Sequence, residues 1–160
     1  MVMDEKDLSQ DKAEDVILVY SENAKIVARL FAKQFIRHED KKKSYIDIKG
    51  GLKVEFFDDS LQISNTVTAK KARYYESDKN VIVQDSVVVV NKKGETLNTE
   101  ELIWNQSIKK FYTNKFVRIT TPTQVLFGDG LEANEDFSWY QIKNIKGNVQ
   151  VEKSVVPAAE

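Results

Sequence analysis

The side chains that most often carry catalysis are nearly absent from this chain. His38 is the only histidine, and it stands in the charged string Arg37-His38-Glu39-Asp40, where an ordinary surface residue is expected. There is no cysteine, which excludes thiol nucleophiles, thiolate metal sites and disulfide bonds together. Without a second histidine or a cysteine, the chain lacks the groups for a catalytic triad or a typical zinc site.

Carboxylate clusters are the remaining candidates for chemistry. Asp58-Asp59 is typical of a hairpin turn. Gly128-Asp129-Gly130 is followed by Glu132, Glu135 and Asp136, but this spacing lacks the alternating ligands of an EF-hand loop, so a solvated bulge is expected. No pair stands out as the acid and base of a glycosidase, and no phosphate-binding glycine motif is present. The sequence predicts no catalytic residue, no metal site and no cofactor.

Composition narrows the classes of function further. Lys and Arg number 24 and Asp and Glu 25, and a formal net charge of −1 argues against a nucleic-acid-binding protein. The one basic run, Lys41-Lys42-Lys43, sits in a polar stretch and is interpreted as a solvated loop. No apolar run is long enough to span a membrane. The first 15 residues are acidic and polar, unlike a signal peptide.

A length of 160 residues is most simply one domain. Residues 1–15 are predicted to form a flexible lead, residues 16–153 a single β domain, and residues 154–160 a flexible tail. Within the domain, short runs rich in Val, Ile, Thr, Tyr and Phe alternate with turn signals, as in antiparallel hairpins. The turn signals are Ser21-Glu22-Asn23, Asp58-Asp59-Ser60, Glu76-Ser77-Asp78, Asn91-Lys92-Lys93-Gly94, Asn105-Gln106-Ser107 and Lys146-Gly147-Asn148.

One segment fits two descriptions. Residues 26–35 place Val27, Leu30 and Phe31 on one side of a helix, or alternate apolar residues on one face of a strand. A strand is favoured, because the neighbouring segments are predicted strands and no helix-capping motif precedes this one.

A hairpin-sized unit repeats along the chain. One set of inward-facing candidates recurs 30 residues later, and a third copy begins 29 residues after the second. The first set is Val67, Ala69, Ala72, Tyr74, Val81, Val87 and Val89; the second is Leu97, Thr99, Leu102, Trp104, Phe111, Val117 and Ile119; the third begins at Leu126, Gly128, Leu131, Ala133 and Tyr140.

The spacing within each unit predicts a β-bulge. Apolar residues two apart are followed by a step of three, which would move the next side chain to the opposite face of a regular strand. One extra residue in a bulge restores the original face. The skipped pairs are Lys70-Lys71, Glu100-Glu101 and Asp129-Gly130, all polar or glycine, as expected at the outer side of a bent strand.

Two interpretations of the stacked hairpins remain open on periodicity. The inward residues are large in one copy (Leu102, Trp104, Phe111) and small in others (Ala69, Ala72, Ala133). Large and small residues interdigitating would fill a solid core, as in a structural or adhesion-type scaffold. Alternatively, two splayed sheets would leave an apolar groove between them. A carbohydrate-active jelly roll is a third hypothesis, and it requires a surface cleft with an aromatic and two facing carboxylates.

Several strings of the chain are more specific than its periodicity. They are GLKVEFFDD (51–59), TAKKARYY (68–75), VVNKKGETLNTEELIW (89–104), FYTNKFVRI (111–119) and FGDGLEANEDF (127–137). The most specific part is Gly94-Glu95-Thr96-Leu97 leading into Thr99-Glu100-Glu101-Leu102 and Trp104, followed by Gly128 and Gly130. Over about residues 16–151 the chain resembles the LptC family of periplasmic lipopolysaccharide-export proteins, most closely the form found in Bacteroidetes.

The resemblance implies an all-β fold, a β-jelly roll of two splayed antiparallel sheets built from repeated hairpins, related to that of LptA. It implies no enzymatic activity: family members receive lipopolysaccharide from an inner-membrane ABC transporter and pass it to an LptA-type bridge protein. The acyl chains of the lipid are expected between the sheets. The lipid-binding residues predicted on this basis are Val54, Phe56, Val67, Tyr74, Leu102, Trp104, Phe111, Val117, Ile119, Leu126, Tyr140 and Ile142.

The resemblance also implies partners and a location. The N-terminal strand, about residues 16–20, is expected to face the transporter, and the C-terminal strand, about residues 139–151, the LptA-type bridge, each through a free strand edge. The family is periplasmic and carries an N-terminal membrane anchor. No such segment stands in the 160 residues, so a tether outside this sequence is expected.

Overall fold

The computed structural model describes residues 10–39 and 42–150, which form antiparallel strands of one 11-stranded sheet. The described residues contain no helix, and hence none long and apolar enough to cross a membrane. The all-β prediction is confirmed. The strands are β1 (Gln10–Glu22), β2 (Lys25–His38), β3 (Tyr45–Phe57), β4 (Ile63–Ala69), β5 (Lys71–Tyr75), β6 (Asn80–Asn91), β7 (Thr96–Asn105), β8 (Lys110–Thr120), β9 (Gln124–Asn134), β10 (Tyr140–Ile142) and β11 (Ile145–Gln150).

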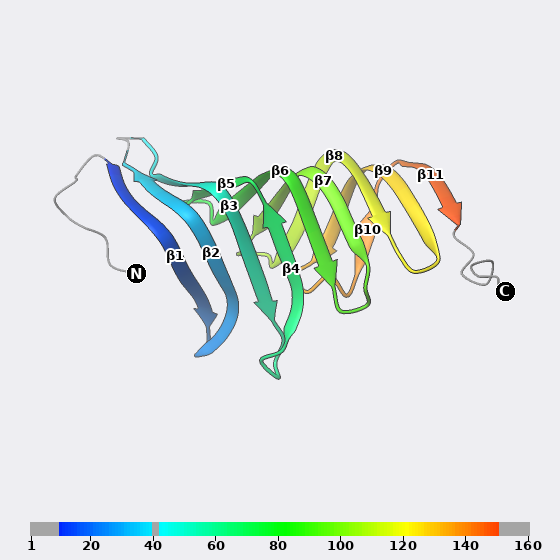
Figure 1. Ribbon diagram of the computed structural model, residues 1–160, viewed down its shortest axis with the longest axis horizontal. Coiled ribbons are helices and arrows are strands. Elements are labelled where there is room, and N and C mark those ends of the chain that lie inside the picture. The colour runs from blue at the N-terminus through cyan, green and yellow to red at the C-terminus, as the bar shows by residue number, and fades with distance from the viewer. Residues whose placement is uncertain (1–9, 40–41, 151–160) are drawn as a thin grey trace.

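The sheet is an up-and-down meander in chain order (Figure 1). β4 and β5 act as two halves of one long strand, because both pair with β3 and β6 and only Lys70 separates them. β10 and β11 are likewise two halves of one strand along β9. β1 pairs only with β2, so among the described residues the sheet ends in free edges at β1 and at β10 with β11.

Every long strand bends at the same level, along a line that we call the crease. The crease passes through the three skipped pairs of the repeat: β4 gives way to β5 at Lys70, the β7–β8 register shifts between Thr99 and Ile103, and Gly130 has a φ of +119°. The bulges therefore lie at the predicted level, but the predicted strands were wrong, because the extra residue lies on the neighbouring strand. The step from Gln84 to Val87 on β6 faces a shorter step on β7, and the step from Thr113 to Phe116 on β8 faces a shorter step on β9.

The crease is also marked by backbone irregularities in other strands. They are Asp15, the β2–β3 shift between Ala32 and Gln34, Gly50 and Gly51, Asp85 and Ser86, and Asn144.

Neighbouring crease residues bond to one another. The Gly51 N–H donates to the Lys70 carbonyl at 2.9 Å, and the Lys70 N–H donates to the Asp85 carbonyl at 3.0 Å. Charged side chains pair at the same level: Lys33 with Asp15 at 3.1 Å, Lys71 with Asp85 at 3.6 Å, and Lys146 with Asp129 at 2.9 Å. These ion pairs are exposed and therefore contribute little to stability. They show that the polar side chains of the crease lie on the solvent side of the bend.

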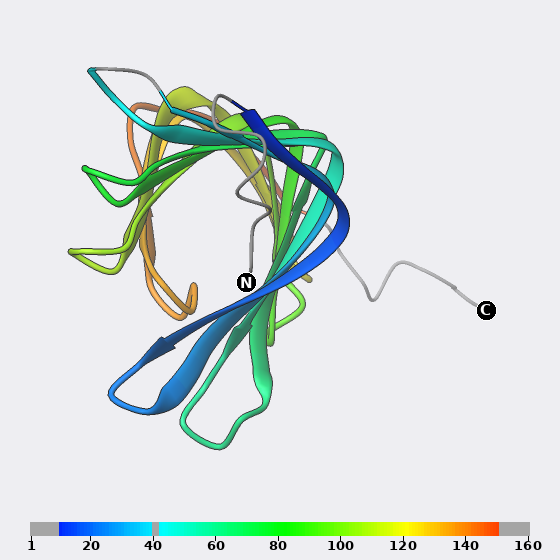
Figure 2. The same ribbon diagram turned by 90° about the vertical axis from the view of Figure 1, so that its left-hand side faces the viewer.

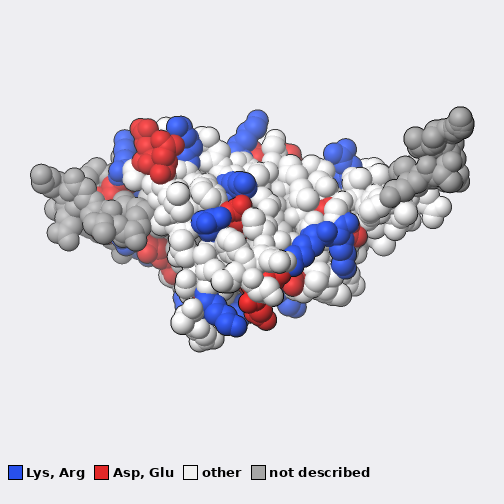
Figure 3. Space-filling model, turned by 60° about the horizontal axis from the view of Figure 1, so that its bottom comes forward, with Lys and Arg blue, Asp and Glu red and all other residues white. Residues whose placement is uncertain are grey.

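The crease divides one sheet into two facing walls, and these correspond to the two splayed sheets of the prediction. Wall A is the part of each strand on the side of the β2–β3 connection and of the turns around residues 76–79, 106–109 and 135–139. Wall B is the part on the side of the turns around residues 23–24, 58–62, 92–95 and 121–123. Seen from the β1 end, the ribbon curls round on itself (Figure 2). On the face drawn in Figure 3, Lys and Arg mix with Asp and Glu in small groups separated by uncharged surface.

Residues on the inner face of wall B line up from strand to strand. Leu18 is opposite Leu30, Leu30 opposite Val54, and the register continues across the whole sheet. The row is Leu18, Leu30, Val54, Val67, Val89, Leu97, Ile119 and Leu126. A row on wall A faces it: Arg37, Ile46, Tyr74, Val81, Trp104, Phe111, Ala133 and Tyr140. The repeated apolar positions of the sequence therefore form the inner surface of both walls.

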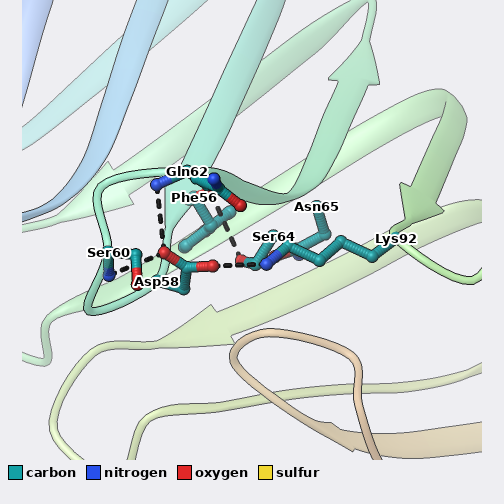
Figure 4. A network of polar contacts seen from close by, with 7 residues as sticks. All are labelled: Phe56, Asp58, Ser60, Gln62, Ser64, Asn65 and Lys92. Atoms are coloured by element: carbon teal, nitrogen blue, oxygen red, sulfur yellow. Dashed lines mark hydrogen bonds and ion pairs between the residues drawn. The ribbon is translucent and has the colours of Figure 1, made fainter.

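A polar network ties two turns at the free edge of wall B (Figure 4). The Asp58 carboxylate accepts the backbone N–H groups of Ser60 at 2.8 Å and Gln62 at 3.0 Å, and it pairs with the Lys92 ammonium. The hydrogen bond from Lys92 holds the pKa of Asp58 below its ordinary value. Asp58-Asp59 thus belongs to a hairpin turn, as predicted, and the Asp58 carboxylate is occupied by the turn itself.

Other sequence predictions are revised at the ends of the domain. The segment 26–35 lies within β2, so the strand interpretation is confirmed. β1 begins at Gln10, so residues 10–15 pair with β2 instead of belonging to a flexible lead. The remaining lead and the 154–160 tail lie outside the described residues.

The predicted C-terminal strand was wrong in one respect, because it is broken in two. A bend at residues 143–144 separates β10 from β11, and the turn expected at Lys146-Gly147-Asn148 is instead part of β11. The break has a physical cause: the strand must cross the crease beside Gly130, where the Lys143 N–H donates to the Gly130 carbonyl at 2.9 Å.

We expect Gly130→Ala to lower the free energy of unfolding by about 1–3 kcal/mol, measured by urea denaturation. Residue 130 has a φ of +119°, and an added Cβ would lie 3.0 Å from the Thr113 carbonyl oxygen. Gly147→Ala is the control, because its Cβ would meet only Phe127 Cδ2 at 3.7 Å. Equal stability of the two variants would contradict the role assigned to the crease glycine.

Candidate functional site

The N-terminal half of the fold is hollow. A cavity of about 430 Å³ lies between the walls, in the size range of roughly 300–1,000 Å³ typical of small-molecule sites. Its lining comes from strands β1 to β8 and from two turns of wall A. The lining residues are Leu18, Val19, Tyr20, Ala28, Leu30, Phe35, Arg37, Ile46, Ile48, Leu52, Val54, Phe56, Val67, Ala72, Tyr74, Lys79, Val81, Val83, Trp104, Gln106 and Phe111.

Small side chains leave the space open at this end. Ala28 on β2 and Ala72 on β5 occupy inward positions that larger residues would fill, and both are buried. In the C-terminal half the equivalent space is filled by side chains that are 0–2% exposed, among them Val117, Ile119 and Leu131. Here large and small residues interdigitate, which was the first of the two interpretations. One fold therefore contains both a groove and a solid core.

An aromatic cluster separates the hollow half from the solid half. The ring of Phe56 lies edge-on to Trp104 and to Phe111, with centroid distances of 4.9 and 5.3 Å. Phe137 packs behind Phe111 at 5.2 Å, and Tyr20 meets Trp104 edge-on at 5.8 Å. Edge-to-face pairs of this kind add stability beyond the area they bury. The cluster forms the inner end of the cavity.

The loop between β9 and β10 closes the solid half by bonding to the opposite wall. The Asn65 side-chain amide donates to the Glu135 carbonyl at 3.2 Å, and the Asn91 amide donates to the Phe137 carbonyl at 3.1 Å. The Tyr140 hydroxyl donates to the Glu95 carboxylate at 3.0 Å, and burial with this bond raises the pKa of Tyr140 to about 12. The walls are therefore fastened together at the C-terminal end.

Glu135 joins this loop to the aromatic cluster. The Trp104 indole N–H donates to the Glu135 carboxylate at 2.8 Å. Burial raises the pKa of Glu135 above its ordinary value, and the Trp104 hydrogen bond opposes that effect. Beside it, the Lys109 ammonium pairs with Glu22 at 2.5 Å, which links a turn of wall A to the end of β1 on wall B. The charge at Glu135 is thus held at the boundary between hollow and solid halves.

The cavity is suited to holding apolar chains and is poorly suited to covalent chemistry. Among the described residues, its lining contains no carboxylate and no histidine, and its charged groups are Arg37 and Lys79. His38 instead stacks on Tyr45 at 4.7 Å and lies 3.4 Å from the Asp47 carboxylate. No cluster of His, Asp or Glu among residues 10–39 and 42–150 is arranged to hold a metal ion. The carbohydrate-active hypothesis, which needs two facing carboxylates in the cleft, finds no such pair in this lining.

All twelve predicted lipid-binding residues lie in or against the apolar core between the walls. They divide into two groups. Val54, Phe56, Val67, Tyr74, Trp104 and Phe111 line the cavity. Leu102, Val117, Ile119, Leu126, Tyr140 and Ile142 do not, and they pack in the core away from it.

The sequence reasoning missed most of the cavity's N-terminal lining. The alternation in β2 and β3 was visible, but these strands lie outside the repeat, and the alternative helical pattern obscured β2. Their side chains were found only when the register placed them beside the repeat residues. The missed apolar residues on β1, β2 and β3 are Leu18, Ala28, Leu30, Phe35, Ile46, Ile48 and Leu52.

Comparison with known proteins gives one family. A family model described as "Lipopolysaccharide-assembly, LptC-related" matches residues 8–151, nearly the whole chain. No curated protein matches the chain significantly in sequence.

We expect Glu135→Gln to change how stability depends on pH. Because the pKa of Glu135 is raised in the fold, its neutral form is favoured there; that stabilisation is complete below pH 4.5 and is lost as pH rises through the raised pKa. The glutamine stays neutral, so the free energy of unfolding of the variant should exceed that of the wild type increasingly above pH 4.5.

Glu132→Gln supplies a control of opposite sign. The Lys110 ammonium lies 2.7 Å from Glu132 and lowers its pKa, so the wild-type carboxylate stabilises the fold at neutral pH and this contribution is lost on acidification. Urea denaturation at a series of pH values measures both. A Glu135→Gln variant that loses stability relative to wild type as pH rises would contradict the burial of this carboxyl.

Proposed function

This chain belongs to the LptC family of lipopolysaccharide-assembly proteins, and we propose that its cavity holds acyl chains of lipopolysaccharide while the lipid moves through the transport system. The family is a periplasmic transport component and not an enzyme, so a role in lipopolysaccharide transport follows from membership. The binding of the lipid by this chain, and its transfer to a bridge protein of the LptA type, are the proposed steps.

The hollow half of the fold carries the proposal. Apolar side chains from both walls surround a space of about 430 Å³, and each methylene moved there from water contributes about 0.8 kcal/mol. Capture in this way is reversible, because it forms no covalent bond. A carrier needs release as well as uptake, and an apolar slot supports both.

The scaffold hypothesis accounts for only part of the molecule. A solid core explains the C-terminal half, where Val117 and Leu131 are fully buried. It does not explain why wall residues of β2, β3 and β5 leave an apolar space when dense packing is the rule in protein interiors. The cavity therefore favours a carrier over a scaffold.

The free edges of the sheet are the proposed docking sites for protein partners. β1, which contains residues 16–20, is proposed to face the inner-membrane ABC transporter, and β10 with β11 the LptA-type bridge. An exposed strand edge offers unpaired backbone groups to which another strand can add. Such docking would place a partner's sheet beside each end of the meander.

A photo-crosslinking amino acid at position 30 should be labelled by lipopolysaccharide in cells. Leu30 lines the cavity, and its neighbour Phe31 lies on the opposite face of the same strand, beside the Arg29 guanidinium. A crosslinker at position 31 is therefore the matched control. We expect labelling at position 30 to exceed that at position 31 at least several-fold, measured by immunoblotting of the lipid adduct. Equal labelling would refute the proposed cavity site.

Photo-crosslinking also tests whether protein partners dock at the two free edges of the sheet. A crosslinker at Ile17, which is 59% exposed on β1 and does not line the cavity, should capture a transporter subunit. One at Val149, 56% exposed on β11, should capture the bridge protein. Mass spectrometry of the adducts identifies each partner. Phe116 on β8 is exposed but lies away from both edges, so it serves as the control. Capture of the bridge at Ile17, or of both partners at Phe116, would argue against the assignment.

A further inference from the structure

The inner row of wall A changes from apolar or aromatic side chains to a charged side chain at its N-terminal end. It is apolar or aromatic from Ile46 through Tyr140, but its member on β2 is Arg37. We propose that Arg37, with Lys79 and Gln106, forms a phosphate-binding rim that holds the anionic headgroup of an amphiphile whose acyl chain fills the cavity. This inference rests on the proposed lipid-binding function and adds to it the group that is recognised and the direction in which the ligand lies.

The three rim residues come together on the free edge of wall A. Arg37 lies near the end of β2, Lys79 in the β5–β6 turn, and Gln106 in the β7–β8 turn. The two turns touch, since the Gln106 N–H donates to the Lys79 carbonyl at 3.1 Å. The Tyr74 hydroxyl lies 3.5 Å from the Gln106 side-chain oxygen. The polar groups of the lining are thus gathered at one edge, and the space behind them is apolar.

Among the described residues, the charged groups that line the cavity are all positive, although carboxylates stand nearby. Glu76 lies 3.2 Å and Glu39 3.8 Å from the Arg37 guanidinium. Neither carboxylate is part of the cavity lining. They hold the guanidinium in place from outside the cavity.

The rim has unused bonding capacity. The Arg37 Nε is buried and has no hydrogen-bond acceptor in the described part of the chain. Buried polar atoms are nearly always paired in folded proteins, so an unpaired one requires an explanation. A phosphate oxygen at the rim would accept a hydrogen bond from the guanidinium.

Guanidinium is the natural recogniser of phosphate. It presents several N–H donors in a fixed plane and stays charged at any physiological pH, and the Lys79 ammonium adds a second, mobile charge. The Gln106 side-chain amide can add a neutral N–H donor beside them, because its oxygen is the atom that faces the Tyr74 hydroxyl. An amphiphile would then lie with its head at the free edge of wall A and its chain directed toward the aromatic cluster.

The experiment compares headgroups on one chain length. An uncharged fluorescent probe, N-phenyl-1-naphthylamine, is bound to the protein and displaced by dodecyl phosphate, by monolauroylglycerol or by dodecyltrimethylammonium, below their micelle concentrations. We expect wild type to bind dodecyl phosphate about tenfold more tightly than monolauroylglycerol, the size of one charge-assisted hydrogen bond. The cationic amphiphile should bind more weakly than the neutral one.

Two variants test the assignment. Arg37→Gln and Lys79→Gln should each reduce severalfold the preference for dodecyl phosphate over monolauroylglycerol. Lys79→Gln breaks no ion pair within the described residues, so it remains informative if Arg37→Gln is unstable by thermal denaturation. The double variant Lys53→Gln with Lys71→Gln is the control for net charge, because these two lysines pair with Glu55 and Asp85 away from the cavity.

The possible outcomes distinguish failure of the phosphate-binding rim from failure of acyl-chain binding in the cavity. An unchanged phosphate preference in both rim variants, or an equal loss in the Lys53 and Lys71 control, would overturn the rim. Failure of all three amphiphiles to displace the probe would overturn chain binding, and the rim with it. Inorganic phosphate alone should not compete with dodecyl phosphate at equal concentration. If it does, the rim is a site for the free ion and the lipid headgroup assignment is wrong.

Discussion

A strand shows its side chains alternately to two faces, and this constraint shapes the whole molecule. A sheet that is to enclose its own apolar face must bend, and a bend must not exchange the faces. Bulges at one level, with the extra residue on β3, β6 and β8, satisfy both demands, since the extra residue restores the alternation. Lys70, Glu100-Glu101 and Gly130 occupy that level, and Asp15, Gly50-Gly51 and Asp85-Ser86 extend it. Wall rows, cavity and free edges all follow from the position of this crease.

The two halves of the interior show how side-chain size decides between storage of a ligand and packing. The backbone geometry of the walls is the same at both ends, because the register is continuous from β1 to β9. Alanine at positions 28 and 72 leaves room, whereas Trp104, Phe111 and Phe137 fill it. The bonds of the β9–β10 loop to Asn65 and Asn91 then fix the filled end. A stable core is thereby provided without occupying the hollow half.

Much of the fold could be predicted from the sequence, and the parts that could not be predicted were missed for physical reasons. The repeat located the inward residues from Val67 to Ile119 and the level of the crease, because a fixed strand periodicity leaves a fixed spacing. It placed the bulges on the wrong strands, since spacing within one strand does not show how its neighbour is paired. It did not reach β1 to β3, where Leu30 and Ile48 belong to no repeat, nor did it foresee that the last strand breaks in two. Which inward residues line a cavity depends on the distance between walls, and no single strand carries that information. The rim residue Arg37 was hidden for the same reason: only its register opposite Ile46 turns it inward.

The meander topology has a further consequence for how the molecule comes apart. Each long strand bonds only to its neighbours in chain order, so stability is close to a sum of nearest-neighbour terms, as in solenoid proteins. Opening then proceeds from an end, one hairpin at a time, and requires no global unfolding. The C-terminal end is fastened across the walls, whereas the β1–β2 hairpin is held to wall A by the Glu22–Lys109 pair and the Tyr20–Trp104 contact. Amide protons of β1 should therefore exchange with solvent long before those of β7 and β8, which makes the first hairpin the softest cooperative unit of the fold.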